Sequence, residues 1–294
     1  MSRFSEALSS GKFAVTCELN PPKGVDLDPL FKKALALEGS VDAFNLTDSA
    51  GSNLAMAPIG AARLLAEKGI ETILQIACRD RNRLALQSEM LAASALGLSN
   101  VLCMTGDPPG RGDHAEAKAV FDIDAIDLLR ALSALASGRD FAGNEMKGTP
   151  EIFAGAVVNP GASDLDKELS RMEYKVKAGA AFFQSQAVYD PEPFEKFMVR
   201  AREFGVPVLA GMIVLKSAKM ARNLDANLPG VSVPQPIIDE MENAENRTAA
   251  STRITAELIN QVKSLCDGVH IMAIGWESKV PKILAAADLA GKAA

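Results

Sequence analysis

Cysteine is scarce in this chain, and its spacing gives little support to a cysteine-based framework. The 294 residues contain four cysteines, namely Cys17, Cys78, Cys103 and Cys266. None of them forms a CxxC pair, which argues against both a zinc site and a disulfide scaffold. The first three lie within or at the ends of apolar runs, so we expect small buried side chains and no metal site.

Histidine is rarer still, and the chain has only His114 and His270. The two are far apart in the sequence, and neither is accompanied by the residues that a catalytic triad or a metal centre would need. We therefore expect His114 to be a solvated loop residue and His270 to be a strand residue.

Long apolar runs and basic clusters are also missing. No run approaches the ~18 apolar residues that a membrane-spanning helix needs. Lys and Arg are scattered, and the net charge of −6 argues against a nucleic-acid-binding face. The first twelve residues are polar and lack the apolar centre of a signal peptide. These absences predict a cytoplasmic protein that neither inserts into membranes nor binds nucleic acid.

Three nucleotide-binding or multidomain signals are absent as well. No GxGxxG follows the first predicted strand, and no loop ends in GK[ST], so neither a Rossmann site nor a P-loop is supported. There is no convincing linker, repeat or low-complexity segment. Because 48% of the residues are apolar, we expect residues 1–294 to form a single domain with a sizeable core.

The sequence does contain a regular alternation of short apolar runs and longer amphipathic segments. The runs predicted to be strands are residues 13–19, 41–47, 72–77, 100–105, 152–158, 180–188, 206–214 and 269–273. Their near-continuous hydrophobicity is typical of parallel strands that are buried on both faces. Eight strand–helix repeats in a chain of this length predict a (β/α)8 TIM barrel, and an open doubly wound sheet is the alternative.

The segments between the predicted strands show helical periodicity. One such series is Leu165, Leu169, Met172 and Val176, with Asp164 as the expected N-cap. Further series are Leu128, Leu132 and Leu135, and Ile254, Leu258, Val262 and Leu265. Residues 138–150 and 227–246 show no such pattern, so we interpret them as long irregular loops.

Polar residues at the ends of the predicted strands are the candidates for chemistry, because a β/α barrel builds its active site there. Glu18 lies in an otherwise apolar strand, where a carboxyl is costly to bury without a purpose or a partner. It could have a raised pKa and act as a proton donor. Alternatively, it could form an ion pair with Arg79 or Arg81. The strand alone does not decide between these interpretations.

Two other strand ends carry polar groups. After the fourth predicted strand, Gly106 would allow a ligand close to the backbone, and two prolines would stiffen the loop that carries Asp107. An ordinary turn with Asp107 as a cap is the alternative. In the sixth strand, Gln184 and Gln186 are two residues apart, so their side chains point to the same face of the strand. The alternation alone does not tell whether that face is the inner or the outer one. They could bind a heterocycle or simply satisfy neighbouring backbone groups.

Five segments in a fixed order give the chain a family resemblance. They are Glu-x-x-Pro-Pro from Glu18, then CRDRN, NVLCMTGDPPG, KVKAGAAFFQSQAVYD and PVLAGMIVL. In this order and spacing, residues 13–273 resemble the methylenetetrahydrofolate reductases. The segments CRDRN and TGDPPG are most similar to those of short or fused bacterial members. Each segment is weak evidence by itself, but the five together are strong.

The resemblance implies a β/α barrel with a non-covalent flavin, usually FAD, although some relatives carry FMN. NADH or NADPH would reduce the flavin, and folate would then replace the nicotinamide. The reaction converts 5,10-methylenetetrahydrofolate to 5-methyltetrahydrofolate in one-carbon metabolism and methionine biosynthesis. Relatives are commonly homo-oligomers, so the resemblance implies an oligomer here too.

The resemblance also implies roles for particular residues. Glu18 matches the family's acid, Asp107 an aspartate near both flavin and pterin, and Gln186 a glutamine that contacts folate. The family's flavin-contact positions correspond to Thr47, Gln75, Thr105, Gly106, Asp107, Glu168 and Lys175. Of these, Lys175 would suit a flavin phosphate.

Three positions depart from the family pattern. Gln75 replaces a histidine, Thr105 replaces an arginine, and Ala218 replaces an aromatic residue. These departures keep two other hypotheses open: a subunit that needs a partner electron-donor protein, and a pterin-binding barrel without flavin.

Overall fold

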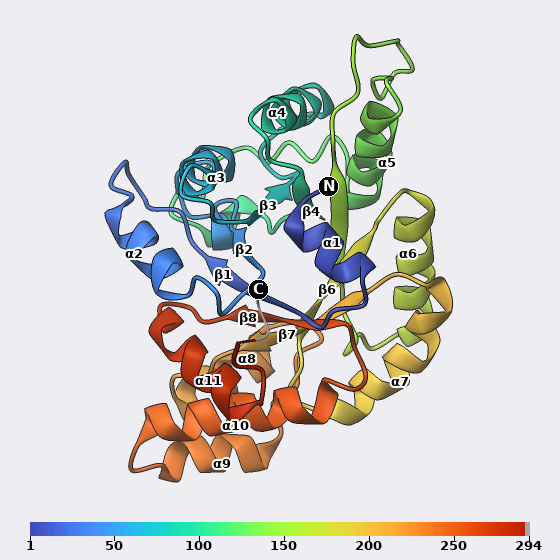
Figure 1. The fold of residues 1–294 in the computed structure, drawn as a ribbon. Coiled ribbons are helices and arrows are strands. Elements are labelled where there is room, and N and C mark those ends of the chain that lie inside the picture. Colours follow the sequence, from blue (N-terminus) through green and yellow to red (C-terminus); the bar gives the residue numbers. More distant parts are fainter. Residues whose placement is uncertain (292–294) are drawn as a thin grey trace.

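The computed structural model describes residues 1–291, in which eight parallel strands close into a barrel (Figure 1). The strands are β1 (Ala14–Leu19), β2 (Ala43–Leu46), β3 (Thr72–Ala77), β4 (Asn100–Met104), β5 (Phe153–Val158), β6 (Phe182–Ala187), β7 (Val208–Ile213) and β8 (Gly268–Met272). Each strand pairs with the next, and β1 also pairs with β8. This closure confirms the predicted TIM barrel and excludes the open sheet. All eight predicted strands are present, with ends that differ by a few residues.

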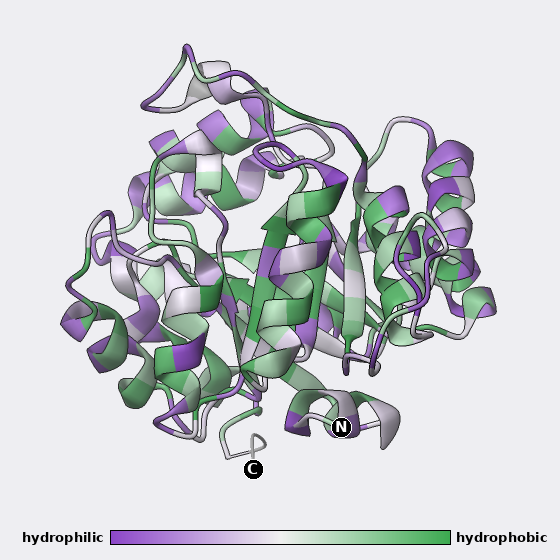
Figure 2. Cartoon of the chain, turned by 90° about the horizontal axis from the view of Figure 1, so that it is seen from above, coloured by the Kyte–Doolittle hydropathy of each residue, from purple (hydrophilic) through white to green (hydrophobic). Residues whose placement is uncertain are grey.

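Helices surround the barrel; all of them connect successive strands except α1, which precedes β1, and α11, which follows β8 (Figure 1). They are α1 (Arg3–Ser9), α2 (Asp28–Ala36), α3 (Pro58–Ala66), α4 (Arg83–Ala95), α5 (Ala125–Ala136), α6 (Leu165–Lys177), α7 (Pro191–Ala201), α8 (Ala218–Asn227), α9 (Gln235–Asn243), α10 (Arg247–Val262) and α11 (Val280–Ala286). The strands at the centre are mostly hydrophobic, whereas hydrophilic residues gather on the outer faces of the helices and on the loops (Figure 2).

The three helices predicted from the apolar periodicity are confirmed and correspond to α5, α6 and α10. The Asp164 carboxylate caps α6 by accepting a hydrogen bond from the Lys167 amide at 2.9 Å. Helix α10 ends at Val262, so Leu265 lies beyond the helix that its spacing predicted.

The loop predicted for residues 227–246 is partly wrong, because α9 lies inside it and packs against α8 and α10. Ile238 and Met241 lie three residues apart and form a buried stripe on one face of this short helix. Pro236 masks the pattern, but proline is tolerated in the first helical turn. Residues 138–150 are irregular, as predicted, with one isolated bridge between Arg139 and Glu145.

The end of the barrel where the strands begin is closed by α1, which lies across the opening (Figure 1). Phe4 from this helix is fully buried, and its ring meets the edge of Phe182 with 5.2 Å between centroids. Phe182 in turn stacks on Phe153 at 5.3 Å. Gly155 leaves the room that this ring needs, since a Cβ there would lie 2.5 Å from it. The interior at this end is therefore filled by apolar side chains.

Three of the four cysteines are buried, as expected, and Cys266 is half-buried. Across residues 1–291, no group of His, Cys, Asp or Glu side chains is arranged to hold a metal ion. No helix in the same range is both long enough and apolar enough to cross a bilayer.

Candidate active site

A cavity of about 660 Å³ opens at the carboxyl ends of the strands. Seven of the predicted catalytic and binding residues line its wall: Gln75, Thr105, Gly106, Asp107, Glu168, Lys175 and Gln186. They come from β3, from the loop after β4, from α6 and from β6. The structure thus brings together side chains that are more than a hundred residues apart in the chain.

Glu18 and Thr47 are not part of this wall. Glu18 lies on β1 beside the cavity and is joined to it by Gln75, whose Nε2 donates to Glu18 Oε2 at 3.3 Å. Thr47 is buried directly after β2, and its hydroxyl donates to Asn20 Oδ1 at 2.7 Å. In this structure, Thr47 therefore joins the carboxyl ends of β1 and β2 by a hydrogen bond.

The surroundings of Glu18 favour its protonated form. Burial raises the pKa of the Glu18 carboxyl, and the nearby Glu277 carboxylate raises it further, whereas the hydrogen bond from Gln75 acts in the opposite direction. The side chain is only 18% exposed. A half-buried carboxyl of this kind can hold a proton at a higher pH than an ordinary glutamate can.

The alternative ion pair between Glu18 and an arginine is not formed. The Arg79 guanidinium instead binds Asp80, with 2.6 Å between Nη2 and Oδ2. Arg81 binds Asp48 on one side and Glu89 on the other, the latter at 2.5 Å. Each arginine thus has an acidic partner elsewhere at the mouth.

The two glutamines of β6 both point into the barrel but lie at different depths. Gln184 is fully buried and exchanges two hydrogen bonds with Asn45, at 2.8 and 3.0 Å. Gln186 lies one layer higher and lines the cavity. The Gln186 Oε1 accepts from the Ala187 amide at 3.1 Å, which leaves its NH2 group available to a ligand.

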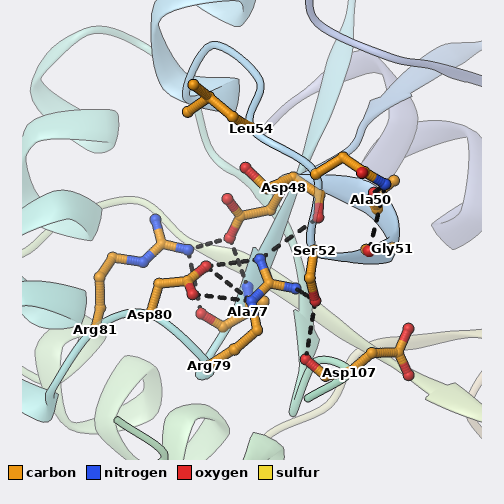
Figure 3. A network of polar contacts seen from close by, with 12 residues as sticks. Asp48, Ala50, Gly51, Ser52, Leu54, Ala77, Arg79, Asp80, Arg81 and Asp107 are labelled. Atoms are coloured by element: carbon orange, nitrogen blue, oxygen red, sulfur yellow. Dashed lines mark hydrogen bonds and ion pairs between the residues drawn. The ribbon is translucent and has the colours of Figure 1, made fainter. Parts of the chain in front are cut away.

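The loop that carries Asp107 is held by Ser52 (Figure 3). The Ser52 hydroxyl lies 3.2 Å from the carbonyl oxygens of Asp107 and Pro108, and it also accepts from Arg79 Nη1 at 3.1 Å. Gly106 has φ of +90°, which glycine adopts readily. Among residues 1–110 and 112–291, no group forms a hydrogen bond or ion pair with the exposed Asp107 carboxylate. The anchoring uses the backbone, so the side chain stays available at the mouth.

The loop after β2 is strained where it meets this network. Ser49 and Ser52 have φ of 47° and 62°, in the left-handed region that non-glycine residues seldom adopt. Asp48, just before this loop, accepts from the Ala77 amide at 2.8 Å. Such strain persists only where the surrounding contacts determine the conformation, and it is concentrated at functional sites.

Helix α6 supplies a charged wall on the other side of the cavity. Lys175 is buried, and its Nζ donates to the Val157 carbonyl at 2.7 Å. Burial lowers the pKa of its ammonium group, and Glu168 partly offsets this effect. Glu168 itself accepts from the Asn159 amide at 2.9 Å. Both side chains are thus engaged with the end of β5.

Two cations on α6 were missed by the sequence reasoning. Lys167 and Arg171 line the cavity, are exposed, and form no ion pair within the described part of the chain. They are four residues apart on the same helical face, and Arg171 is four residues before Lys175. This spacing was visible in the sequence, but only the packing of α6 shows that the face meets the cavity.

Comparison with known proteins identifies the family. A sequence model described as methylenetetrahydrofolate reductase matches residues 3–288. This chain belongs to the methylenetetrahydrofolate reductase family. The family resemblance drawn from the sequence motifs is therefore confirmed.

Curated relatives in the family are distant and longer. The chain is 26% identical over 234 residues to a probable methylenetetrahydrofolate reductase (NADPH) of Caenorhabditis elegans, covering 76% of this chain and 33% of the relative. It is 26% identical over 228 residues to the methylenetetrahydrofolate reductase (NADH) 1 of Zea mays, covering 74% of this chain and 38% of the relative. The chain thus spans about a third of the length of these relatives.

Solved structures of low sequence identity share the fold. An uncharacterized protein from Clostridium thermocellum, described as binding two copies of 5-methyl-5,6,7,8-tetrahydrofolic acid, superposes with a TM-score of 0.63 at 15% identity, covering 97% of this chain and 98% of that one. A tryptophan synthase from M. tuberculosis reaches 0.54 at 12% identity, covering 99% and 98%. At these identities the likeness concerns the barrel alone.

The three departures from the family pattern have distinct surroundings. Gln75 is bonded to Glu18, as described above. Thr105 lies on the cavity wall, and its hydroxyl accepts from the Ala125 amide at 3.4 Å, at the start of α5. Ala218 is buried as the first residue of α8. The cavity wall thus carries an amide at Gln75 and a hydroxyl at Thr105, whereas Ala218 does not line it.

Proposed function

We propose that this chain is a flavin-dependent methylenetetrahydrofolate reductase, which converts 5,10-methylenetetrahydrofolate to 5-methyltetrahydrofolate. The observation that carries this proposal is the position of Glu18, a carboxyl of raised pKa that Gln75 joins to a cavity displaying Asp107 and Gln186. The family membership and the folate bound by the C. thermocellum barrel support the same substrate class.

The cavity fits a flavin in size and in charge. Its volume of about 660 Å³ falls within the range of ~300–1,000 Å³ typical of small-molecule sites. Lys167 and Arg171 supply unpaired cations for phosphate groups, a role for which the buried Lys175 is less accessible. Thr105, Gly106 and the helical wall at Glu168 would complete the flavin contacts. We propose FAD as the cofactor, with FMN as the alternative.

Each catalytic side chain has a defined task in this proposal. When bound and reduced, the flavin supplies the hydride. Glu18 donates a proton to the folate, whose five-membered ring then opens to an electrophilic iminium. Gln186 binds the pterin through its free NH2 group. The Asp107 carboxylate binds the amino groups of the pterin and disfavours negative charge on the adjacent ring system.

The nicotinamide NADH or NADPH is the proposed reductant, since relatives named for each exist in the family. The test is anaerobic mixing of the purified protein with FAD or FMN, a reduced nicotinamide and 5,10-methylenetetrahydrofolate. We expect a yellow protein that NADH or NADPH bleaches and that then forms 5-methyltetrahydrofolate. A protein that binds folate but neither flavin would contradict the proposal and favour the pterin-binding alternative.

A second candidate function is a flavin and folate subunit that takes its electrons from a partner protein. It is favoured by the changes at Gln75, Thr105 and Ala218, which alter the surfaces against which a nicotinamide would stack. Co-purification from a native extract, followed by the same absorbance assay, separates the two functions. A lone protein that NADH reduces fully would exclude the partner requirement. The homo-oligomer, the cytoplasmic location and the single-domain organisation stay predictions.

A further inference from the structure

A chain of buried polar groups crosses the barrel one layer below the cavity. His270 on β8 is only 3% exposed, and its Nδ1 lies 2.9 Å from the Thr16 hydroxyl on β1. The Thr16 oxygen accepts from Gln184 Nε2 on β6 at 3.3 Å, and Gln184 is locked to Asn45 on β2 by its two amide bonds. Four strands thus contribute to one network in an interior that is otherwise largely apolar.

The direction of the Gln184 bonds favours one neutral form of the imidazole. The Gln184 NH2 group donates one hydrogen to Asn45 and the other to Thr16. The Thr16 hydroxyl keeps its own hydrogen, which it can donate to His270 Nδ1 at 2.9 Å. A neutral imidazole whose Nδ1 accepts carries its hydrogen on Nε2. That nitrogen lies on the side of Glu18, 4.0 Å from its Oε2.

We propose that His270 is a positioning residue for Glu18, held by Thr16, Gln184 and Asn45 in the tautomer that directs its Nε2–H at the acid. This inference rests on the proposed function of Glu18 as the proton donor. Once Glu18 has given up its proton, the aimed N–H stabilises the carboxylate that forms, and a preorganised donor of this kind lowers the barrier to proton transfer. The 4.0 Å separation is one that can tighten in a substrate complex.

Burial disfavours the ionised form of Glu18. On the β8 side of this carboxyl, the His270 Nε2–H is the group that can counteract that effect. Gln75 donates from β3, and the Glu277 carboxylate lies in the 3₁₀ helix η4 (Glu277–Lys279), where it pairs with Lys33 at 3.3 Å. Burial lowers the pKa of His270 to about 3, so the ring stays neutral at working pH. His270 therefore acts as a fixed N–H donor and does not relay protons.

The first test observes the tautomer itself. Because the chain has two histidines, a His114→Gln variant with ¹⁵N-labelled histidine gives spectra of His270 alone. We expect a neutral ring with hydrogen on Nε2 and a bare Nδ1 at neutral pH. A ring protonated on Nδ1, or on both nitrogens, would overturn the proposal. This readout does not depend on activity, so it stands even if the folate reaction is absent.

The second test changes Thr16 and leaves His270 and Glu18 in place. Thr16→Val removes the hydroxyl that fixes the ring, and Thr16→Ser restores it. We expect Thr16→Val to slow the folate half-reaction by about 3- to 10-fold, the effect of one lost hydrogen bond, while reduction of the flavin keeps its rate. Thr16→Ser should recover most of the loss.

The pH profile distinguishes positioning from a general structural effect. Without the aimed N–H, the ionised form of Glu18 is less stabilised, so its pKa rises. A general acid loses activity as pH rises through its pKa, and the alkaline limb of the folate half-reaction should therefore move to higher pH in Thr16→Val. An unchanged limb in a folded Thr16→Val protein would contradict the proposal. Absence of the folate half-reaction in the wild type would instead refute the proposed function.

Discussion

The two ends of the barrel differ in the kind of side chain that they contain. Where the strands begin, α1 closes the opening with Phe4 and the interior contains stacked aromatic rings. Where the strands end, a cavity of about 660 Å³ displays carboxylates, amides and free cations. Between the two ends lies the polar layer of Thr16, Asn45, Gln184 and His270. The same eight strands therefore serve packing at one end and chemistry at the other.

This contrast teaches how stability and function are separated along a barrel. Burial of large aromatic side chains is among the strongest stabilising contributions in a core. A carboxyl kept at raised pKa, such as Glu18, costs stability instead. Substitutions at the two ends should therefore affect different observables, and the following predictions test that separation from the largest effect to the smallest.

Glu18→Gln should have the largest effect, and only at the open end. A general acid contributes about 100- to 10,000-fold, so the folate half-reaction should slow by that factor, whereas reduction of the flavin should be nearly unchanged. Anaerobic stopped-flow absorbance measures both rates separately. Glu38→Gln, at an exposed position beyond α2, is the matched control and should change neither rate. Equal losses in both half-reactions would mean that Glu18 is structural.

Phe4→Ala should have its main effect at the closed end. Truncation of a fully buried phenylalanine costs about 3–5 kcal/mol of unfolding free energy, because it removes apolar burial and leaves a cavity. Urea denaturation followed by circular dichroism measures this change. Val199→Ala, at a 65% exposed position on α7, should stay within about 0.5 kcal/mol. Large changes in both half-reaction rates of the folded Phe4→Ala protein would show that the two ends are coupled.

Arg171→Ala should weaken flavin binding by about 10- to 100-fold, since hydrogen bonds to charged groups contribute about 1.5–3 kcal/mol. Flavin titration followed by fluorescence quenching gives the affinity. Lys177→Ala is the control on the same helix, because Lys177 pairs with Glu173 at 2.6 Å and does not line the cavity. Equal affinities for wild type and Arg171→Ala would place the flavin phosphates elsewhere.

The smallest effect concerns the stability contribution of Glu18 itself. Because its pKa is raised on folding, the folded state loses stability as pH rises from the unfolded pKa through the folded one. Gln does not titrate, so the stability of Glu18→Gln relative to wild type should rise as the pH is raised from 4 to 8. Denaturation curves at the two pH values measure this change, and a relative stability that does not rise would contradict the raised pKa.

The barrel could be predicted from the sequence because its strands are buried on both faces. Runs such as residues 72–77 and 206–214 are apolar without interruption, which limits them to a covered parallel sheet. Helix α9 could not, because its buried stripe is limited to Ile238 and Met241 and proline occupies its first turn. Short helices depend on tertiary packing more than on local propensity.

The residues that line the site could be predicted better than the groups to which they bind. Five of the seven cavity candidates lie on strands or directly after them, and strand ends converge in any barrel, whereas Glu168 and Lys175 reach the cavity from α6. The partners of charged groups depend on distances in space, and so the ion pair of Glu18 with Arg79 or Arg81 could not be excluded beforehand. For the same reason Lys175, which binds a backbone carbonyl, looked like a phosphate ligand, whereas Arg171 was overlooked.

We propose that the open end of this barrel performs the folate half-reaction by itself. The most direct measurement is to reduce the flavin-loaded protein photochemically without oxygen, and then to add 5,10-methylenetetrahydrofolate while recording the flavin absorbance. We predict that the oxidised spectrum returns as 5-methyltetrahydrofolate accumulates, with no nicotinamide or partner protein present. A spectrum that stays bleached, with no methylated product, would contradict the account.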